Sequence, residues 1–492
     1  MSSFYDSTLC IPILGDEFYL VQAPKNVTEL FHSTKLAVSR PWSLVLRHCL
    51  GIKKKAVEAH LADTSGTRRG TIPGSAPRSR NDCIAHLTHE NFTSGLLRGC
   101  LNPATVRFRE KFQDSFKSSF DIGHDWSYMP DVTEFFRQYL GPAIIRTLFG
   151  RALLEMNPSF LRDLWDYDDH VMDLAKQYPR FWIPRTYRAR DRLLSAIGSW
   201  HDKAISEAEP TEDLGWSHSA WGTKMMRDRY NTLLGAPGQD EASVASTNLA
   251  YIWASVSNVV PSSATLAIYI LSDKALVSSL QSSLSSLSPD LLPKELESIP
   301  LLVSAYAEAL RFGVHIHVPR NAPHHDVRVQ GVTIPKDKLL FVNTYLAHND
   351  EAVWNTRNGE KPLNRFCADR FLTDPSDPSS GPAKKMKQAA ASGKAKGGVQ
   401  FSTEGLDGAW IPFGGGQQAC PDRLLAKRIM PFTAALLLRY FDMELLVDGG
   451  KPSFHSPRFG LSVAMPTAPV PFRLRRRNHV CGPESTHFER GD

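Results

Sequence analysis

The stretch of sequence that decides the fold is Pro412-Phe413-Gly414-Gly415-Gly416-Gln417-Gln418-Ala419-Cys420-Pro421-Asp422-Arg423. A glycine-rich loop leads into a single cysteine, Cys420, and Pro421 then opens an apolar helical segment. Proline suits the first position of a helix, and the positive end of the helix dipole favours an anion, which lowers the pKa of a thiol there. A flexible loop followed by a helix start is what a thiolate needs to reach a haem iron, so Cys420 is the predicted axial ligand.

Composition places the chain among ordinary globular proteins. It has 492 residues, of which 42% are hydrophobic and 22% charged, and its net charge of +6 is too mild to predict a nucleic-acid partner. No stretch reaches about 18 uninterrupted apolar residues, so no transmembrane helix or anchor is predicted. The seven cysteines are scattered and odd in number, which favours free thiols in a reducing compartment over a disulfide framework.

Hydrophobic spacing predicts a mostly helical chain with a small β region. The longest helical candidate is apolar nearly all round, which predicts burial, and Pro261 removes the N–H that the Ser257 carbonyl would bind, so a kink is expected there. The segment 105–206 is also read as helical, with breaks expected at Pro130, Pro142 and Pro158. Other predicted elements are helices over 242–271, 300–312 and 421–446 and short strands over 17–22 and 314–342.

The cysteine loop alone has blander interpretations. Three adjacent glycines can form a phosphate loop, but no Gly-Lys-Ser/Thr follows them, and a lone buried cysteine usually serves core packing. Three further elements occur in the chain. They are Glu308-Ala309-Leu310-Arg311, whose two charges share one helix face, Phe366-Cys367-Ala368-Asp369-Arg370-Phe371, and the polar break Ser257–Asn258 before Pro261.

Together these motifs resemble the cytochrome P-450 (haem-thiolate monooxygenase) family over roughly residues 15–477. The resemblance implies a mainly α fold with a small β region, in a single catalytic domain over 15–477. Within it, 374–398 is interpreted as a mobile insertion, and 478–492 as a disordered tail. By resemblance, Glu308, Arg311 and Arg370 form a buried salt-bridged triad behind the haem, supporting the cysteine loop.

The resemblance also implies how haem b is held. Arg320, nine residues after Arg311, falls where the family places a propionate-binding arginine. Phe413 is expected beside the sulfur, and Gly414 and Gln418 complete the cofactor-binding set. The chain departs from the family where Gln418 replaces the usual Arg or His, and where Asp422 replaces the usual Gly. No Trp-x-x-x-Arg is evident in the early helical region, where Arg98 is a weak substitute.

The long helix of most family members carries an acid and a threonine over the haem. Here Ser257 replaces the acid and Asn258 replaces the threonine, and these two residues with the freed carbonyl are the proposed proton-delivery site. The string Trp253-Ala254-Ser255 with Asn258 and Pro261 resembles the branch that holds sterol 7α- and 12α-hydroxylases, prostacyclin synthase and fungal secondary-metabolism enzymes. That branch includes true monooxygenases and an isomerase, so both reactions stay open.

The favoured function is oxidation, most simply hydroxylation, of an apolar natural product such as a terpenoid, sterol-like, polyketide or alkaloid skeleton. Its electrons would come from NADPH through a separate reductase docked on the basic residues Arg423, Lys427 and Arg428. A reductase-independent isomerase or dehydratase, and a haem-binding protein without catalysis, are the alternatives. The family implies the cytoplasmic side of the endoplasmic reticulum, with peripheral membrane contact or a cytosolic location as further options. Candidate pocket linings are Trp253 and the segments 91–105, 314–318 and 459–463, with His315 and His317 facing away.

Overall fold

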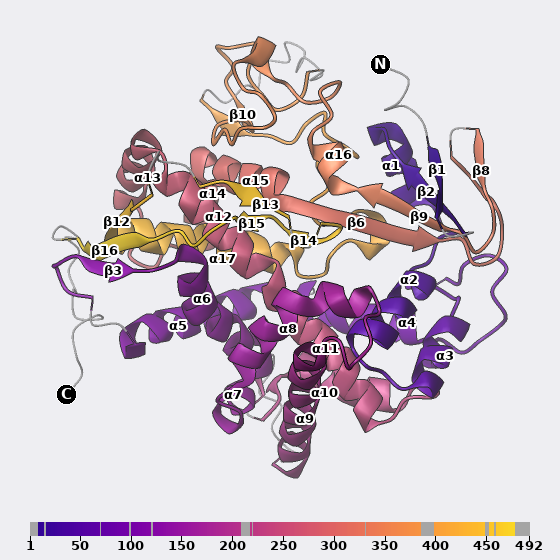
Figure 1. The fold of residues 1–492 in the computed structure, drawn as a ribbon. Coiled ribbons are helices and arrows are strands. Elements are labelled where there is room, and N and C mark those ends of the chain that lie inside the picture. Colours follow the sequence, from indigo (N-terminus) through magenta and orange to yellow (C-terminus); the bar gives the residue numbers. More distant parts are fainter. Residues whose placement is uncertain are drawn as a thin grey trace.

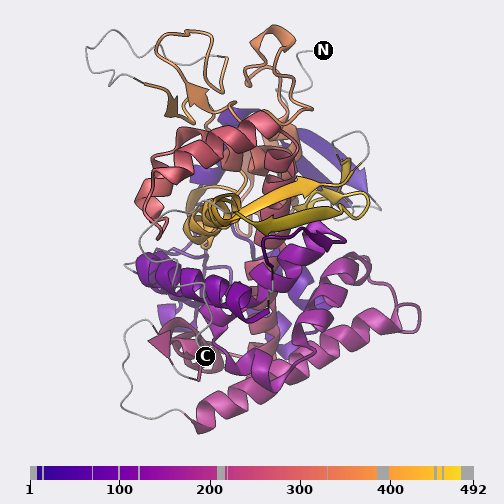
Figure 2. The same cartoon turned by 90° about the vertical axis from the view of Figure 1, so that its left-hand side faces the viewer.

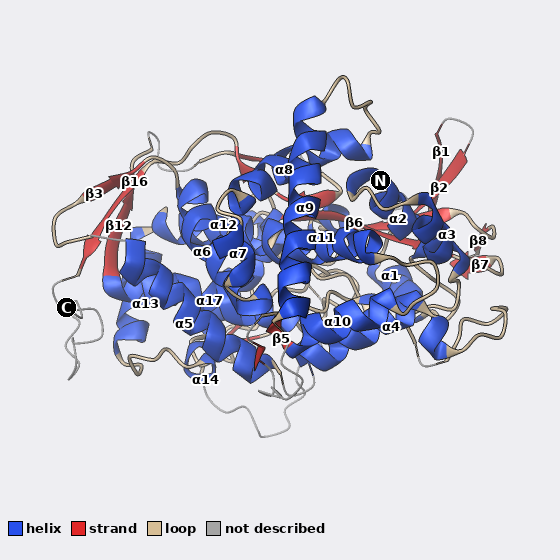
Figure 3. Cartoon of the chain, turned by 90° about the horizontal axis from the view of Figure 1, so that it is seen from below, coloured by secondary structure: helices blue, strands red, loops and turns tan. Residues whose placement is uncertain are grey.

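The structure is a computed structural model of the full chain. The residues that it describes are 8–13, 16–68, 70–97, 100–119, 122–207, 217–218, 220–329, 331–384, 398–447, 452–456 and 459–477. The expected tail 478–492, Arg98, and most of the expected insertion, 385–397, lie outside the described residues. Helices dominate and strands gather at two ends of the molecule (Figure 3), so the expectation of a mainly α fold with a small β region is confirmed.

Four helices pack against one another to form the central bundle: α5 (Leu101–Ser119), α6 (Val132–Phe149), α12 (Val259–Leu271) and α17 (Arg423–Tyr440). The side chains that α6 and α12 turn toward each other are almost all buried. Asp131 caps α6 by accepting N–H groups from Thr133 and Glu134 at 3.3 and 3.2 Å. Pro142 lies inside α6, where a break was expected. That prediction was wrong because buried packing on both sides of the proline outweighs its helix-breaking tendency.

The main sheet has the order β1-β2-β9-β6-β14, with β9 at its centre, and its neighbour β6 is visible as a long arrow (Figure 1). Only β2 and β9 run parallel; the other neighbours are antiparallel. The bounds are Leu9–Ile13 (β1), Asp16–Val21 (β2), Leu339–Asn343 (β9), Val314–Asn321 (β6) and Leu461–Val463 (β14). Because β6 follows directly from helix α15 (Pro300–Gly313), the sheet and the helical bundle meet at residues 313 and 314.

The long helix predicted over 242–271 is two helices, α11 (Glu241–Ser257) and α12, with Asn258 between them. Asp240 caps α11 by accepting the N–H of Ser243 at 2.8 Å. Helices α8 (Phe160–Ala175) and α9 (Pro184–Ser206) pack on each other, and α9 also packs on α11. Helices α8 and α9 lie on the side of the molecule opposite the orange loops (Figure 2).

The C-terminal helix is shorter than predicted. It starts at Arg423 and not at Pro421, and it ends at Tyr440, after which the chain becomes strand β12 (Phe441–Leu445). Strand β12 pairs with β16 (Phe472–Arg476), which in turn pairs with β3 (Ser127–Met129). The apolar spacing of the sequence continues past residue 440. The backbone of residues 441–445 nevertheless leaves the helix, because it forms its hydrogen bonds with the distant strand β16.

The remaining elements lie outside the central bundle and the main sheet. The helical ones are α1 (Pro24–His32), α2 (Ser39–Leu44), η1 (Val45–Cys49), α3 (Lys54–Ala62), η2 (Arg80–Asp82), α4 (Ile84–Phe92), η3 (Thr93–Leu97), α7 (Ala152–Met156), α10 (Lys224–Leu234), α13 (Lys274–Ser285), α14 (Pro293–Glu297), α16 (Thr344–His348), η4 (Arg357–Gly359) and η5 (Gly416–Gln418). The strands are β4 (Ser217–His218), β5 (Gly222–Thr223), β7 (Val327–Val329), β8 (Val332–Ile334), β10 (Leu372–Thr373), β11 (Gln400–Phe401), β13 (Phe454–His455) and β15 (Met465–Pro466).

Candidate active site

The cysteine loop is shaped by close packing against α1. Gly414 and Gly416 adopt φ angles of 67° and 66°, which side chains disfavour. A Cβ on Gly416 would lie 2.0 Å from the Phe31 carbonyl oxygen, and one on Gly415 would lie 2.1 Å from the Phe31 ring. The run of glycines is therefore required by the approach of the loop to α1 as well as by its backbone angles.

The loop delivers Cys420 to the wall of a cavity. The Cys420 N–H donates to the Phe413 carbonyl at 2.9 Å, and the backbone N–H groups of Asp422 and Arg423 donate to the Cys420 sulfur. Burial nevertheless raises the pKa of the Cys420 thiol to about 12, and the Asp422 carboxyl adds to the rise. The backbone donors at the helix start lower this pKa as expected, but desolvation outweighs them, so the net shift is upward. A coordinated metal ion deprotonates a thiol outright.

The cavity lies between the α11–α12 junction and α17 and has a volume of about 290 Å³. Its walls are mostly apolar, and Phe413, Gly414, Gln418 and Cys420 line it as predicted cofactor-binding residues. Other lining residues come from α6, α11, α12, α15, β6 and α17: Ile144, Leu148, Ala254, Val259, Leu310, Val314, Ile316, Val318, Leu425, Ile429 and Met430. Sequence reasoning missed Ile144 and Leu148, whose apolar character does not distinguish a cavity wall from a packed core.

The residues expected to bind the propionate groups of haem b suit that role. Arg320 is 5% exposed, and no described carboxylate lies within ion-pair distance of it. Its donors reach only the carbonyls of Pro319 at 2.8 Å and Gly415 at 3.5 Å, and burial lowers its pKa to about 10. Arg320 does not line the cavity itself but an adjoining pocket, and Gln418 lines both. An acidic group is what the buried guanidinium lacks, and a propionate supplies one.

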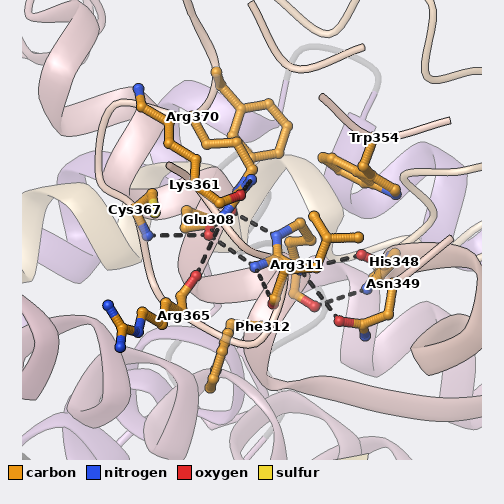
Figure 4. A network of polar contacts seen from close by, with 12 residues as sticks. Glu308, Arg311, Phe312, His348, Asn349, Trp354, Lys361, Arg365, Cys367 and Arg370 are labelled. Carbon is orange, nitrogen blue, oxygen red and sulfur yellow. Dashed lines mark hydrogen bonds and ion pairs between the residues drawn. The ribbon is translucent and has the colours of Figure 1, made fainter. Parts of the chain in front are cut away.

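Behind the loop, Glu308, Arg311 and Arg370 form the predicted triad (Figure 4). All three side chains are buried. Arg311 forms a two-pronged pair with Glu308 at 2.7 and 2.8 Å, and Arg370 donates to the same carboxylate at 2.9 Å. The Cys367 N–H adds a fourth donor to Glu308 at 3.1 Å. The remaining guanidinium donors of Arg311 and Arg370 reach carbonyl oxygens of the residues 348–365, which fixes those loops to α15.

His348 connects the triad to the segment that precedes the cysteine loop. Its Nδ1 lies 3.0 Å from the Arg311 carbonyl, and its Nε2 accepts the Ile411 N–H at 3.1 Å. Only a neutral imidazole can donate at one nitrogen and accept at the other. Burial and the neighbouring Arg311 charge lower the pKa of His348 to about 3, so this neutral form persists in the folded protein.

At the α11–α12 junction, Asn258 has φ −106° and ψ −44° and lines the cavity. Its carbonyl accepts the Ser262 N–H at 3.1 Å, whereas Pro261 has no N–H to offer the Ser257 carbonyl. The Ser257 side chain is buried and is not among the cavity-lining residues, while Ser255 and Ser262 are. The structure thus brings Asn258 and Cys420 to the same cavity and leaves the Ser257 side chain in the helix packing.

Comparison with known proteins agrees with this geometry. The family model described as Cytochrome P450 matches residues 52–472. A cytochrome P450 monooxygenase, efuG, from Hormonema carpetanum is 32% identical over 80% of this chain and 72% of its own length. The chain belongs to the cytochrome P450 family. It is therefore an oxidoreductase family member, and the family implies haem iron as its cofactor.

Two further comparisons bear on the branch and the fold of this cytochrome P450. A 25-hydroxycholesterol 7-alpha-hydroxylase from Rattus norvegicus is 22% identical over 81% of this chain and 91% of its own length. The structure of cyanobacterial CYP120A1 with retinoic acid bound superimposes with a TM-score of 0.64 at 16% identity, covering 96% of this chain and 92% of the other. The predicted likeness to fungal and sterol 7α-hydroxylase P450s is confirmed, and CYP120A1 confirms the fold.

Asp422 stands where the P450 family usually has glycine, and its side chain is accommodated at the cavity wall. Burial raises the pKa of Asp422 to about 7, and the Tyr251 hydroxyl of α11 opposes that rise. Neither the Asp422 Oδ1 atom nor the Tyr251 hydroxyl has a hydrogen-bond partner of normal geometry among the described residues. The Asp422 carboxyl and the Tyr251 phenol interact electrostatically, a pairing that the sequence did not reveal.

The predicted substrate linings are placed unevenly. Val314, Ile316, Val318 and Val463 line the cavity. Trp253 turns the other way and donates its indole N–H to Asp168 at 2.7 Å, so its prediction as a lining residue is wrong. The described residues of the segment 91–105 contribute nothing to the cavity wall, and from 459–463 only the last residue does so.

The rings of His315 and His317 both lie against Phe459. His315 does not line the cavity, as expected, but His317 does, so the expectation that it faces away was wrong. The described part of the chain holds no cluster of three metal-ligating side chains.

The basic residues after the cysteine are partly engaged within the protein. Arg423 donates to the Cys420 carbonyl at 3.0 Å, and Glu297 lies 3.5 Å from both Lys427 and Arg428.

Proposed function

We propose that this P450 is a haem-thiolate monooxygenase that hydroxylates an apolar natural product in fungal secondary metabolism, using O₂ and electrons from NADPH. The observation that carries the proposal is the apolar cavity whose wall holds both Cys420 and Asn258. Fungal cytochrome P450 monooxygenases among its relatives support the biosynthetic setting. A terpenoid, sterol-like, polyketide or alkaloid skeleton suits walls of this character.

Each predicted residue has a defined task in this proposal. Haem iron, when bound, would supply the activation of dioxygen, and the Cys420 sulfur would hold the iron. Arg320 and Gln418 hold the propionates, and Phe413 and Gly414 pack beside the sulfur. Asn258 holds water over the reacting position, with the Ser257 carbonyl as a second acceptor. The apolar side chains of β6 and α6 keep the substrate desolvated.

The first test is the absorption spectrum of the purified, reduced, CO-bound protein. Wild type should show a strongly red-shifted Soret band, and Cys420→Ser should lose it because a neutral ligand replaces the thiolate. Cys49→Ser is the matched control, since Cys49 is also buried but does not line the cavity. A normal band in Cys420→Ser would remove the basis of the assignment. Absence of haem from wild type would mean that Gln418 and Asp422 have disrupted the haem site, and the monooxygenase proposal would lose most of its support.

The reaction type is tested by turnover with and without electrons. Hydroxylation requires NADPH and a separate reductase, whereas an isomerase or dehydratase acting on a peroxide or alcohol requires neither. The replacement of the acid–threonine pair by Ser257 and Asn258 is the feature that keeps the second reaction class in view. Product formed at the same rate without NADPH would favour the isomerase.

We also propose peripheral contact with the cytoplasmic face of the endoplasmic reticulum. The loop between α8 and α9 exposes Phe181 and Trp182, which are 76% and 67% exposed. Aromatic side chains beside basic ones, here Arg180 and Arg185, suit a membrane interface. The α11–α12 segment is the one described stretch long and apolar enough to span a membrane, and most of it is buried inside the protein.

Membrane contact is tested by co-sedimentation with vesicles of phosphatidylcholine and phosphatidylserine. The variant carrying Phe181→Ser and Trp182→Ser should stay in the supernatant. Tyr128→Ser is the control, because Tyr128 is 65% exposed on strand β3 and lies outside this loop. Equal sedimentation of all three proteins would contradict the contact.

A further inference from the structure

A buried hydroxyl from the far end of the chain holds the amide of Asn258. Ser462 lies in strand β14, is 1% exposed, and donates its hydroxyl hydrogen to Asn258 Oδ1 at 3.0 Å. The two residues are 204 positions apart in sequence. The contact therefore joins the helix junction over the cavity to the main sheet.

The Ser462 hydroxyl is held on a rigid support. Ser462 pairs with His315 in the antiparallel register of β14 and β6. Two residues further on, Ala464 donates its N–H to the Gly313 carbonyl at 2.7 Å. Strand β6 continues directly from α15, which carries the Glu308–Arg311 pair. The hydroxyl thus has little freedom to move away from Asn258.

Asn258, by contrast, lies at a helix break, where regular helix geometry does not determine its side chain. An asparagine amide has one oxygen acceptor and an NH₂ group with two donors. Since Ser462 occupies the oxygen, the NH₂ group is left as the part of the amide available to the cavity. Without a hydroxyl at position 462, the amide has no described partner that distinguishes its oxygen from its nitrogen.

We propose that Ser462 is a positioning residue that fixes the Asn258 amide with its NH₂ group toward the cavity. In that orientation Asn258 donates hydrogen bonds to an oxygen-containing ligand or water. The proposal rests on the proposed function, because it concerns how Asn258 performs the task assigned to it there. It adds Ser462, which lies outside the long helix, to the proposed proton-delivery site. Most family members carry an acid within that helix for this task.

The test measures the C–O stretching band of the reduced CO complex, because a donor near the CO oxygen shifts this frequency. Wild type should give one dominant band. The hydrogen bond from Ser462 should favour the proposed orientation of the Asn258 amide over the flipped one by about fivefold. Ser462→Ala should therefore raise a second band by about fivefold relative to the first. Ser462→Thr keeps the hydroxyl in a residue that suits a strand and should restore the wild-type band.

Ser263→Ala is the matched control, because Ser263 is a buried serine of α12 whose hydroxyl bonds the Val259 carbonyl and does not line the cavity. A parallel measurement is the hydrogen peroxide released per NADPH consumed with a separate reductase. This ratio should rise in Ser462→Ala and not in Ser462→Thr or Ser263→Ala.

An unchanged CO band in Ser462→Ala, with a band that does shift in Asn258→Ala, would overturn the role of Ser462 and leave that of Asn258 intact. If Asn258→Ala also gives the wild-type band, the role of Asn258 in the proposed function fails, and with it the role of Ser462. The double variant separates the two further. Ser462→Ala should change nothing more once Asn258→Ala is present, because the amide it positions is gone.

Discussion

Replacing Glu308 by glutamine should destabilise the protein far more than the same change in an exposed ion pair. Glu308 is the single carboxylate between two buried guanidinium groups, and it accepts four hydrogen bonds of 2.7–3.1 Å. Glutamine keeps the shape but removes the negative charge and turns an NH₂ group toward donors of Arg311 or Arg370. Leaving buried charges uncompensated costs about 3–5 kcal/mol. That is a large part of a typical unfolding free energy of about 5–15 kcal/mol.

The control is Glu444→Gln on strand β12. Glu444 pairs with Arg473 at 2.5 and 2.8 Å, so the contact distances resemble those of the triad, but both side chains are more than 40% exposed. Exposed pairs contribute about 0–1 kcal/mol because water and salt screen the charges. The comparison therefore isolates burial from contact distance.

The assay is equilibrium unfolding in urea followed by tryptophan fluorescence and by the Soret band. Arg370→Lys is a second variant for the case in which Glu308→Gln does not fold, because it retains the charge and loses several carbonyl contacts. A free-energy loss in Glu308→Gln no larger than that in Glu444→Gln would refute the reasoning. Such a result would mean that water reaches the triad or that the loops relax around it.

Three other outcomes are expected. Above pH 6.5, His348 is neutral in both the folded and the unfolded chain. Below pH 6.5 His348 becomes protonated in the unfolded chain, whereas in the folded protein it stays neutral until about pH 3. Stability is therefore lost as pH falls through this window, by about 2 kcal/mol at pH 5. His348→Gln should lose that part of the decline between pH 7 and pH 5 in urea titrations, and an unchanged decline would contradict the assignment. Arg320→Gln should release haem to apomyoglobin faster than wild type, whereas Arg328→Gln, at an exposed position of β7, should not. Asp240→Ala should cost about 1 kcal/mol by removing the cap of α11, measured as a lower urea midpoint at unchanged slope, and Asp240→Asn should recover most of it.

Much of the site could be predicted from sequence because its key spacings are local. Glu308 and Arg311 are three residues apart on one helix, so their pairing needs only helix formation. The glycines before Cys420 and the proline after Asn258 act on the backbone within a few residues, and the structure shows the loop and the helix break where they were expected. Such features are encoded by steric rules that hold whatever surrounds them.

The tertiary structure decided what depends on packing between distant segments. Pro142 stays inside α6 because the surrounding core holds that helix, and residues 441–445 leave α17 to pair with β16. Burial raises the pKa of Cys420, against the effect that its place before a helix predicts. The Ser462–Asn258 bond spans 204 residues, and no local pattern indicates that these two residues meet. Desolvation and long-range contacts arise only when the chain is folded, so they are properties of the assembled structure and not of any motif.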